Sequence, residues 1–381
     1  MKKAYFLAGF IITLMTLSPV FGAYNRLIWE QTYDAGLTDM AYGLALDSDD
    51  NVIVTGTSYC ADKKNRNYYT IKYDKNGEVL WEKYYDVGLR DVSYDVAVDS
   101  NDNVIVTGTT SGKFFTIKYD KKGNLLWTDS PSRGNDDEAY AVAVDSEDNI
   151  IITGRTKIIV YNYYTIKYDK NGKMLWNVMW TNGEDDVPYD VAVDSKDNII
   201  VTGFSSNGVD HKGRGDYTYY TFKYDKDGKY LWHGKWATSY SYAEAYGVTT
   251  DLEDNVIVTG FVMEKNNRDY FTVKCNPEGI ILWQKTYDRD FYDCAYDVAT
   301  DKNNNVYVTG ISYSGAGNYD FCTIKYNPSG EFEWEKIHDF NRNDMPQEIL
   351  ISSDGNIIIA GSTDSITWDF LTIKFKSKWL Q

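Results

Sequence analysis

The sequence predicts an all-β protein, a seven-bladed β-propeller with four antiparallel strands in each blade. Three observations lead to this prediction. A run that ends in a glycine, such as "NVIVTG", recurs throughout the 381-residue chain. Aromatic residues make up 16% of the chain and include 34 Tyr, a composition that favours strands. The two ends of the chain each carry part of one unit, so that together they complete it.

The repeat is marked by the glycine that closes each run. Successive glycines are 46 residues apart at the closest (Gly108 to Gly154) and 57 at the widest (Gly203 to Gly260). Strand-rich units repeated at this period are typical of propellers. The seven glycines are Gly56, Gly108, Gly154, Gly203, Gly260, Gly310 and Gly361.

Each unit contains four extended segments, which the second unit shows clearly. Residues 94–99 ("YDVAVD") alternate, whereas residues 104–108 ("VIVTG") are apolar on both faces and must be covered on both. Residues 114–120 ("FFTIKYD") lead through "KKG" into residues 124–127 ("NLLW"). Asp or Asn opens this turn and Gly takes the left-handed position, which is usual for a short hairpin. The aliphatic pair before each Trp is expected to be buried.

The chain ends predict how the ring closes. The last unit stops at "LTIKFKSKWLQ" without a fourth strand, and "NRLIWEQTYD" near the start matches the fourth strand "EVLWEKYYD" of the first unit. We therefore expect the N-terminal strand to complete the last blade, which removes an open sheet edge. Seven Trp then share one position, where they are expected to fill the gap between blades: Trp29, Trp81, Trp127, Trp176, Trp232, Trp283 and Trp334.

The first residues resemble an export signal. Lys2 and Lys3 precede an apolar run, and small residues at Val20 and Gly22 suit cleavage after Gly22. This predicts a signal peptide over 1–22 and a single propeller domain over 23–381, secreted, periplasmic or at the cell surface, with no membrane span after cleavage. A single uncleaved anchor helix is the alternative, although the run is short for a span.

The composition limits the partners. A net charge of −17 argues against nucleic acid and anionic membranes, because both require a basic surface. It suits a cation or a cationic partner, and we expect a monomer. The four cysteines fall at different places in the repeat, so neither a disulfide framework nor a metal site is indicated, although one disulfide is compatible with the sequence. They are Cys60, Cys275, Cys294 and Cys322.

Two repeated lines carry a family resemblance. The pattern "DVAVDSxDNVIVTG" followed by "YTIKYDxxGxxLW", where x varies, covers essentially all of residues 24–381. It resembles the SBBP-type repeat, a family of predicted seven-bladed propellers in exported bacterial and archaeal proteins. The resemblance implies the fold and export, and it implies no shared activity.

Charged residues recur in register with the repeat. Each unit has a Lys in its third strand, and six units have an Asp three residues before the inner-strand aromatic, from which we expect ion pairs or turn caps. A further Asp opens the next turn and is expected to be an Asx-type turn residue. The three sets begin with Lys72, Asp39 and Asp47.

The innermost strands are expected to line the central channel. They begin with Tyr in six units and Gln347 in the seventh, and the next residue is acidic in four. Four carboxylates at the channel mouth could hold a hard cation such as Ca²⁺, which takes oxygen ligands. The alternative is a hydrated acidic rim. The four residues are Asp95, Asp190, Asp297 and Glu348.

A third set lies where the variable loop enters the third strand. Flat side chains there are followed by an amide or carboxylate, a pairing that a sugar-binding site needs. The alternative is packing of aromatic residues at strand ends. The candidate ligand-binding residues are Tyr161, Asn162, Tyr217, Tyr319, Asp320, Trp368 and Asp369, together with His211 in the longest loop.

No standard catalytic signature occurs in the chain. His211 is the one candidate general base, and a solvated loop histidine is its alternative. We expect an exported, non-enzymatic binding or scaffold propeller acting through its loop face on a protein or glycan ligand at the cell envelope. The alternatives are a multivalent carbohydrate-binding propeller and a polysaccharide hydrolase or lyase with a loop-face pocket, whose nameable residues are His211 and Asp216. Propellers host all three classes.

Overall fold

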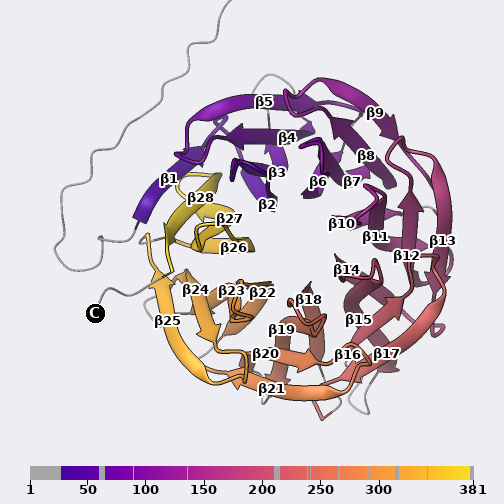
Figure 1. The fold of residues 1–381 in the computed structure, drawn as a ribbon. Coiled ribbons are helices and arrows are strands. Elements are labelled where there is room, and N and C mark those ends of the chain that lie inside the picture. The colour runs from indigo at the N-terminus through magenta and orange to yellow at the C-terminus, as the bar shows by residue number, and fades with distance from the viewer. Residues whose placement is uncertain are drawn as a thin grey trace, which may run out of the picture.

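The computed structural model describes residues 27–59, 65–88, 90–134, 136–209, 215–237, 239–240, 242–264, 267–289, 292–313, 317–340 and 342–377. These residues form 28 strands, and no helix occurs among them. The strands make seven four-stranded sheets arranged around a central channel (Figure 1). The predicted seven-bladed, all-β propeller is confirmed.

Two further sequence-based expectations concern the start of the chain and the membrane. The predicted signal peptide, residues 1–22, lies outside the described residues, so its cleavage stays a prediction. Within the described ranges, the chain forms no helix of the length and apolarity that crossing a bilayer requires.

Each of the first six blades is a continuous stretch of chain. Blade 1 contains β2 (Asp39–Leu46), β3 (Val52–Tyr59), β4 (Arg66–Tyr73) and β5 (Val79–Tyr85), and blade 2 contains β6 (Asp91–Val98), β7 (Val104–Thr110), β8 (Lys113–Tyr119) and β9 (Leu125–Asp129). Blade 3 contains β10 (Glu138–Val144), β11 (Ile150–Lys157), β12 (Tyr161–Tyr168) and β13 (Met174–Trp180), and blade 4 contains β14 (Asp186–Val193), β15 (Ile199–Val209), β16 (Gly215–Tyr224) and β17 (Tyr230–Trp236). Blade 5 contains β18 (Ala243–Thr250), β19 (Val256–Glu264), β20 (Asn267–Cys275) and β21 (Ile281–Tyr287), and blade 6 contains β22 (Asp293–Thr300), β23 (Val306–Tyr313), β24 (Tyr319–Tyr326) and β25 (Phe332–His338).

Blade 7 joins the two ends of the chain. It contains β26 (Asp344–Ile351), β27 (Asn356–Asp364) and β28 (Trp368–Lys376), and its fourth strand is β1 (Leu27–Tyr33). β1 pairs antiparallel with β28, with Trp29 opposite Lys374 and Tyr33 opposite Phe370. The predicted closure by the N-terminal strand is therefore confirmed, and the first and last colours of Figure 1 meet in one blade.

The repeated glycine marks a close approach between two strands. A Cβ atom added to Gly108 on β7 would lie 2.0 Å from the carbonyl oxygen of Val92 on β6. At the six equivalent glycines, the Cβ would lie 2.0 to 2.2 Å from the corresponding carbonyl of the same blade. Directly beyond this point the pairing of β6 with β7 shifts by one residue. Only glycine allows this approach, because real Cβ atoms do not come so near to a backbone oxygen.

The repeated Trp joins each blade to the next. The indole N–H of Trp81, in blade 1, donates to the carbonyl of Lys121 at 3.1 Å; Lys121 lies in the β8–β9 hairpin of blade 2. The glycine of that hairpin, Gly123, has φ +79°, and its Cβ would lie 3.1 Å from the Trp81 ring. Five further junctions repeat this packing, so the prediction that Trp fills the gap between blades is confirmed for six of the seven tryptophans, whereas Trp334 packs against Tyr307 of its own blade. The other tryptophans in this role are Trp29, Trp127, Trp176, Trp232 and Trp283.

The repeated Lys is buried and paired. Lys167 Nζ lies 2.7 Å from Asp145 Oδ2, and both side chains are at most 4% exposed. Lys167 also donates to the carbonyl of Lys226 in the next blade at 2.9 Å, the same carbonyl that accepts the Trp176 indole. Four equivalent ion pairs lie at 2.6 to 2.8 Å, whereas Lys325 pairs instead with Glu333.

The repeated Lys was expected to form ion pairs with the Asp39 set, but its partners come from the Asp47 set. The Asp47 set forms the ion pairs with the repeated Lys and also opens the turns, with Asp47 Oδ1 accepting the N–H groups of Asp49 and Asn51. The Asp39 set caps the loops that precede the inner strands. Asp91, for example, accepts the N–H groups of Val87 and Gly88 and the hydroxyl of Thr110. These residues stand at the opposite end of the inner strand, beyond the reach of the repeated Lys.

The aliphatic pair before each Trp is exposed, so the expectation that it is buried is wrong. Val79 and Leu80 are 54% and 52% exposed. Val79 pairs with Tyr73 and Trp81 pairs with Lys72, which leaves Leu80 in a bulge on the outermost strand. Because of this bulge, Trp81 covers the neighbouring hairpin while the aliphatic pair points outward.

Candidate binding site at the channel and the loop face

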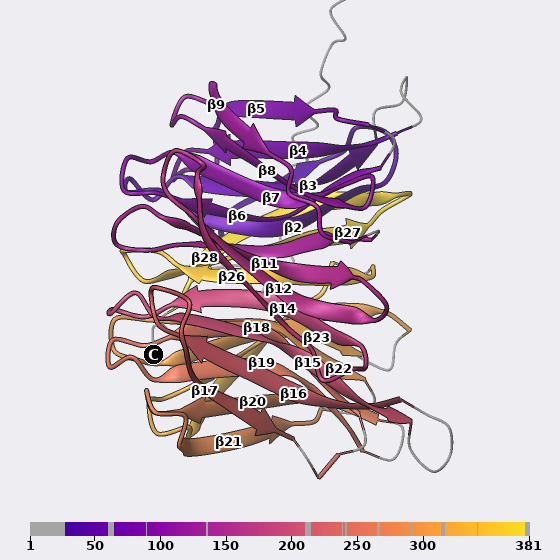
Figure 2. The same ribbon diagram turned by 90° about the vertical axis from the view of Figure 1, so that its right-hand side faces the viewer.

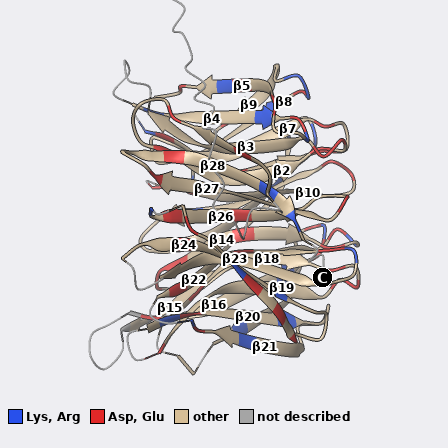
Figure 3. Cartoon of the chain, turned by 90° about the vertical axis from the view of Figure 1, so that its left-hand side faces the viewer, with Lys and Arg blue, Asp and Glu red and all other residues tan. Residues whose placement is uncertain are grey.

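One end of the ring carries two kinds of connection. The loops that follow β3 and β5, and their counterparts in the other blades, emerge together at what we call the loop face (Figure 2). Backbone hydrogen bonds join them: Met263 N–H donates to Tyr242 O at 2.8 Å, and Tyr313 N–H donates to Tyr292 O at 3.1 Å. The two kinds of connection therefore share one face of the ring. In Figure 3, acidic and basic residues occur in many loops and in some stretches of strand, whereas most of the strand ribbon carries uncharged residues.

Six tyrosines line the central channel. Each comes from the same position on the innermost strand of a blade, and neighbouring ring centroids are 4.9 to 5.6 Å apart. Gln347 occupies the seventh position. Together with the acidic residues that follow, they line a cavity of about 170 Å³. The six are Tyr42, Tyr94, Tyr140, Tyr189, Tyr246 and Tyr296.

The four predicted channel carboxylates all line this cavity and also tie the blades together. Asp95 accepts the N–H of Val96 in its own strand at 2.6 Å and that of Val142 in the next blade at 2.7 Å. Asp190 does the same with Val191 and Val248. Asp297 and Glu348 accept an N–H from the following blade, from Ile349 at 2.8 Å and from Leu44 at 2.5 Å.

Small residues separate the acidic positions. Gly43, Ala141 and Gly247 occupy the equivalent positions in blades 1, 3 and 5. A Cβ on Gly43 would lie 2.6 Å from the Cα of Asp95, and a Cβ on Gly247 would lie 2.8 Å from the Cα of Asp297. A small residue is therefore required where an acid-bearing strand comes close.

The carboxylates have little compensation for their charge. Burial raises the pKa of Asp95 to about 8 and that of Asp190 to about 7. Burial, together with the neighbouring acids, also raises the pKa of Asp297 and Glu348 well above their usual range. Among the described residues, no Lys or Arg forms an ion pair with any of the four.

The predicted calcium site gains no support from this arrangement. Ca²⁺ needs several oxygen ligands at about 2.3–2.6 Å, so its carboxylates must converge. Within the described chain, the groups of three acidic residues whose oxygens lie within 4.8 Å of one another do not include the channel residues. Their oxygens are instead directed to backbone N–H groups. The alternative of a hydrated acidic rim stays a prediction.

The predicted stacking residues are used in contacts within the protein. The Arg155 guanidinium lies 4.2 Å from the Tyr161 ring centroid, and the Tyr161 hydroxyl donates to Asp136 at 2.7 Å. Tyr217 packs edge-on against Phe204 and Tyr242, with centroids 4.8 and 4.7 Å apart. Tyr319 packs against Tyr292 at 5.7 Å. The alternative of aromatic packing at strand ends describes these residues.

The polar residues predicted beside them lie on the other side of the strand, because successive side chains alternate. Asn162 is buried, and its amide donates to the carbonyls of Thr156 and Val160. Asp320 and Asp369 are buried too, whereas Trp368 is half-buried. Each predicted aromatic–polar pair is therefore split across its sheet. His211 lies outside the described residues.

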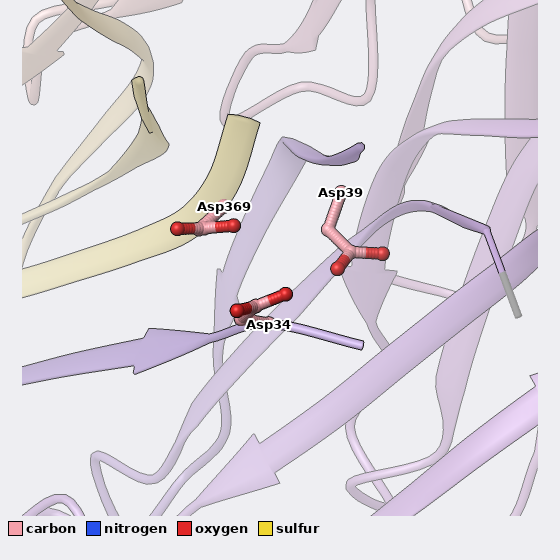
Figure 4. Close-up of side chains that lie close together, drawn as sticks. All are labelled: Asp34, Asp39 and Asp369. Carbon is pink, nitrogen blue, oxygen red and sulfur yellow. The ribbon is translucent and has the colours of Figure 1, made fainter. Parts of the chain in front are cut away.

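Two acidic groups on the loop face were not predicted as groups. Asp34, Asp39 and Asp369 lie within 4.8 Å of one another (Figure 4), as do Asp339, Asp344 and Asp320 at the equivalent positions one blade away. Either group could hold a metal ion by its chemistry. Asp39 also caps the loop by accepting the N–H of Ala35 at 2.7 Å, and burial raises its pKa to about 6.

Two Glu-centred clusters were not predicted from the sequence. Glu244 accepts the hydroxyls of Tyr242 and Tyr246 at 2.7 Å each. Glu138 pairs with Arg155 at 2.9 Å. A signal was available, because acidic residues occur at this inner-strand position only in blades 3 and 5.

A third contact extends the aromatic surface around the channel mouth. The Arg268 guanidinium lies 4.1 Å from the Phe261 centroid and 4.9 Å from that of Tyr292. Charged side chains and aromatic rings are thus in contact with one another at several places on blades 3 to 6. The three described cysteines, Cys275, Cys294 and Cys322, are free and buried, and Cys60 lies outside the described residues.

Comparisons with known proteins support the fold. No protein-family model matches the chain, so the SBBP-type repeat stays a resemblance. An uncharacterized WD repeat-containing protein of Acanthamoeba polyphaga mimivirus is 28% identical over 113 residues, and the match covers 26% of this chain and only 8% of that protein.

Three solved structures share the propeller fold across most of the chain. YCF48 bound to the D1 peptide has a TM-score of 0.58 at 12% identity, covering 93% of this chain and 96% of that one. Chaetomium thermophilum Sqt1 bound to the N-terminus of ribosomal protein L10 has 0.56 at 10%, covering 88% of each. The Dos1 propeller has 0.52 at 10%, covering 91% and 95%. At these identities the likeness concerns the fold.

Proposed function

We propose that this protein is an exported, non-enzymatic binding propeller that docks a protein partner on its loop face. The observation that carries the proposal is the surface of Tyr and Arg around the channel mouth on blades 3 to 6. Tyr and Arg dominate the residues that contribute most to protein–protein affinity. The contacts of Arg155 and Arg268 with aromatic rings hold these side chains in place, which lowers the entropy lost on binding.

Two of the fold neighbours add support. YCF48 is described bound to a peptide and Sqt1 bound to the N-terminus of a ribosomal protein. A propeller of this architecture can therefore present a polypeptide-binding surface. Export and a partner at the cell envelope rest on the apolar, Lys-preceded segment at residues 1–22.

Site-directed photo-crosslinking tests the proposal. A crosslinking amino acid is placed at Tyr217 or Tyr319 on the loop face, and at Lys173 as an exposed control on the hairpin end of the ring. The mature chain from Ala23 is expressed in its own host and its crosslinked products are identified by mass spectrometry. One protein enriched from both loop-face positions and absent from the control is expected.

A second measurement separates the alternatives. Tyr319→Ala with Trp368→Ala should weaken capture of that partner while circular dichroism stays that of the wild type. Equal capture from Lys173, or undiminished capture by the double variant, would refute docking on the loop face. Binding on a glycan array that the same variant abolishes would replace the protein partner with a sugar, and turnover of a polysaccharide would favour the hydrolase alternative.

A further inference from the structure

The channel cavity combines three properties in one place. It has six tyrosine rings around it, four carboxylates on the strands behind them, and no Lys or Arg of the described residues paired with those carboxylates. The carboxylates are held by backbone N–H groups of two blades, so they cannot swing out to solvent without breaking the joints between blades. Such a cavity presents four carboxyl groups, fixed in position, beside an aromatic wall, and these groups can ionise next to a bound cation.

Two of the tyrosine hydroxyls donate to glutamates that do not line the cavity. Tyr140 donates to Glu138 and Tyr246 donates to Glu244. The rings, rather than these hydroxyls, are therefore left to form the wall. Aromatic rings attract organic cations through their quadrupole, an interaction worth about 0.5–2 kcal/mol for each well-placed ring.

The wall and the spacing of the acids favour an organic cation over a metal ion. A metal ion would need three or more oxygens to converge, and the channel carboxylates do not. An ammonium group bearing alkyl substituents spreads its charge and is satisfied by rings and by carboxylates at longer range. The cavity, at about 170 Å³, accommodates several water molecules or one small organic group.

We propose that this cavity binds an organic ammonium group between the tyrosine rings and the channel carboxylates. The group can come from a free amine or from a lysine side chain of a docked protein. A free amine would bind whether or not a protein docks on the loop face, so this proposal does not depend on the proposed function.

Isothermal titration calorimetry of the full mature chain tests it with three probes. Tetramethylammonium and 1,5-diaminopentane carry the charge, and 1,5-pentanediol is the neutral control. We expect saturable binding of both cations and none of the diol. Titration in two buffers of different protonation enthalpy should also report proton release, since the carboxyls hold protons at neutral pH and ionise beside a cation.

Variants locate the site. Asp190→Asn with Asp297→Asn should weaken cation binding by at least about tenfold, whereas Asp49→Asn, on an exposed turn, should leave it unchanged. Gln347→Lys places an ammonium group on a residue that lines the cavity and should abolish binding of both cations and raise the melting temperature, with Gln347→Met as its matched control. Misfolding cannot explain both results, because the Gln347→Lys variant is expected to be more stable than the wild type.

The outcomes decide the proposal. Equal binding of diol and diamine, absence of cation binding at millimolar concentration, or undiminished binding by the double variant would overturn it. A lysine-containing peptide that competes with tetramethylammonium, while its norleucine counterpart does not, would assign the group to a protein partner. Failure of that peptide beside successful binding of 1,5-diaminopentane would assign it to a free amine.

Discussion

Replacing Lys167 by Met should strongly destabilise the protein, because it leaves a buried carboxylate without its partner. Lys167 Nζ contacts Asp145 at 2.7 Å with both side chains almost fully buried, and it donates to the Lys226 carbonyl of the next blade at 2.9 Å. Breaking one half of a buried ion pair typically costs about 3–5 kcal/mol. Met keeps the unbranched chain up to the position of the Lys Cε, so the loss reports mainly the charge and the hydrogen bonds of Nζ.

The cost can be converted into a melting temperature. At about 2.1 cal/mol/K per residue, a domain of roughly 350 residues unfolds with an entropy of about 0.7 kcal/mol/K. A loss of about 3–5 kcal/mol should then lower the melting temperature by about 4–7 °C. Scanning calorimetry and urea denaturation of the variant check this value, with Lys173→Met, at an exposed site, as the matched control.

A double variant tests the mechanism. Asp145→Asn removes the charge while its amide oxygen still accepts the N–H groups of Glu147 and Asn149, which Asp145 Oδ1 bonds at 2.9 and 2.8 Å. Asp145→Asn together with Lys167→Met should recover part of the stability that Lys167→Met loses. If Lys167→Met alone melts within about 1 °C of the wild type, the buried pair is not a main joint between blades and the argument fails.

Four further predictions follow from the contacts. Gly108→Ala should prevent folding or lower the melting temperature by more than Lys167→Met, because its Cβ would lie 2.0 Å from the Val92 carbonyl, whereas Gly88→Ala meets only side-chain atoms at 3.1 Å or more. Trp232→Phe should cost about 1 kcal/mol by removing the 2.8 Å indole bond to Pro277 O, measured by urea denaturation. Leu80→Gln should change the free energy of unfolding by less than about 0.5 kcal/mol, since this side chain is half exposed. The melting temperature should be higher at about pH 5 than at about pH 8: a folded pKa raised to about 8 for Asp95, 7 for Asp190 and 6 for Asp39 gives stability that is lost as pH rises through these values. A melting temperature that rises over this interval would contradict the last of these.

The same linkage has the opposite sign at acid pH. Burial alone would raise the pKa of Asp145, but the hydrogen bonds from Lys167 and Asn149 outweigh it and lower the pKa below its usual value. The stability that this group contributes is present above about pH 4 and is lost as pH falls through its folded pKa. Maximum stability should therefore lie in the mildly acidic range.

The repeat made the fold predictable because each recurring residue makes the same local contact in nearly every blade where it occurs. The Thr-Gly glycine marks the close approach to the inner strand, and the Trp lies on the glycine of the next hairpin. Which of the two Asp sets forms the ion pairs with the repeated Lys was not predictable in the same way. It depends on which end of the inner strand lies near the repeated Lys, and spacing along the chain does not give that distance.

The candidate sites were only partly predictable for a related reason. The four channel acids were identified because strand register alone places them on the innermost strand. The aromatic–polar pairs at the third-strand entry failed as a site, because adjacent residues in a strand face opposite sides, so that Asn162 is buried while Tyr161 is not. The Glu138–Arg155 and Glu244–Tyr242 contacts join different strands and loops, and one sequence does not pair them.

The odd number of blades explains the most irregular part of the channel. Acidic and small residues alternate from blade 1 to blade 6, and a strict alternation cannot close over seven positions. The mismatch falls at blade 7, where Glu348 follows Asp297 directly and its longer side chain reaches Leu44 across the closing junction. The same blade carries Gln347 in place of the channel Tyr. The ring thus has one distinct sector, at the blade built from both chain ends, and a ligand that enters the cavity meets its one break in the tyrosine wall there.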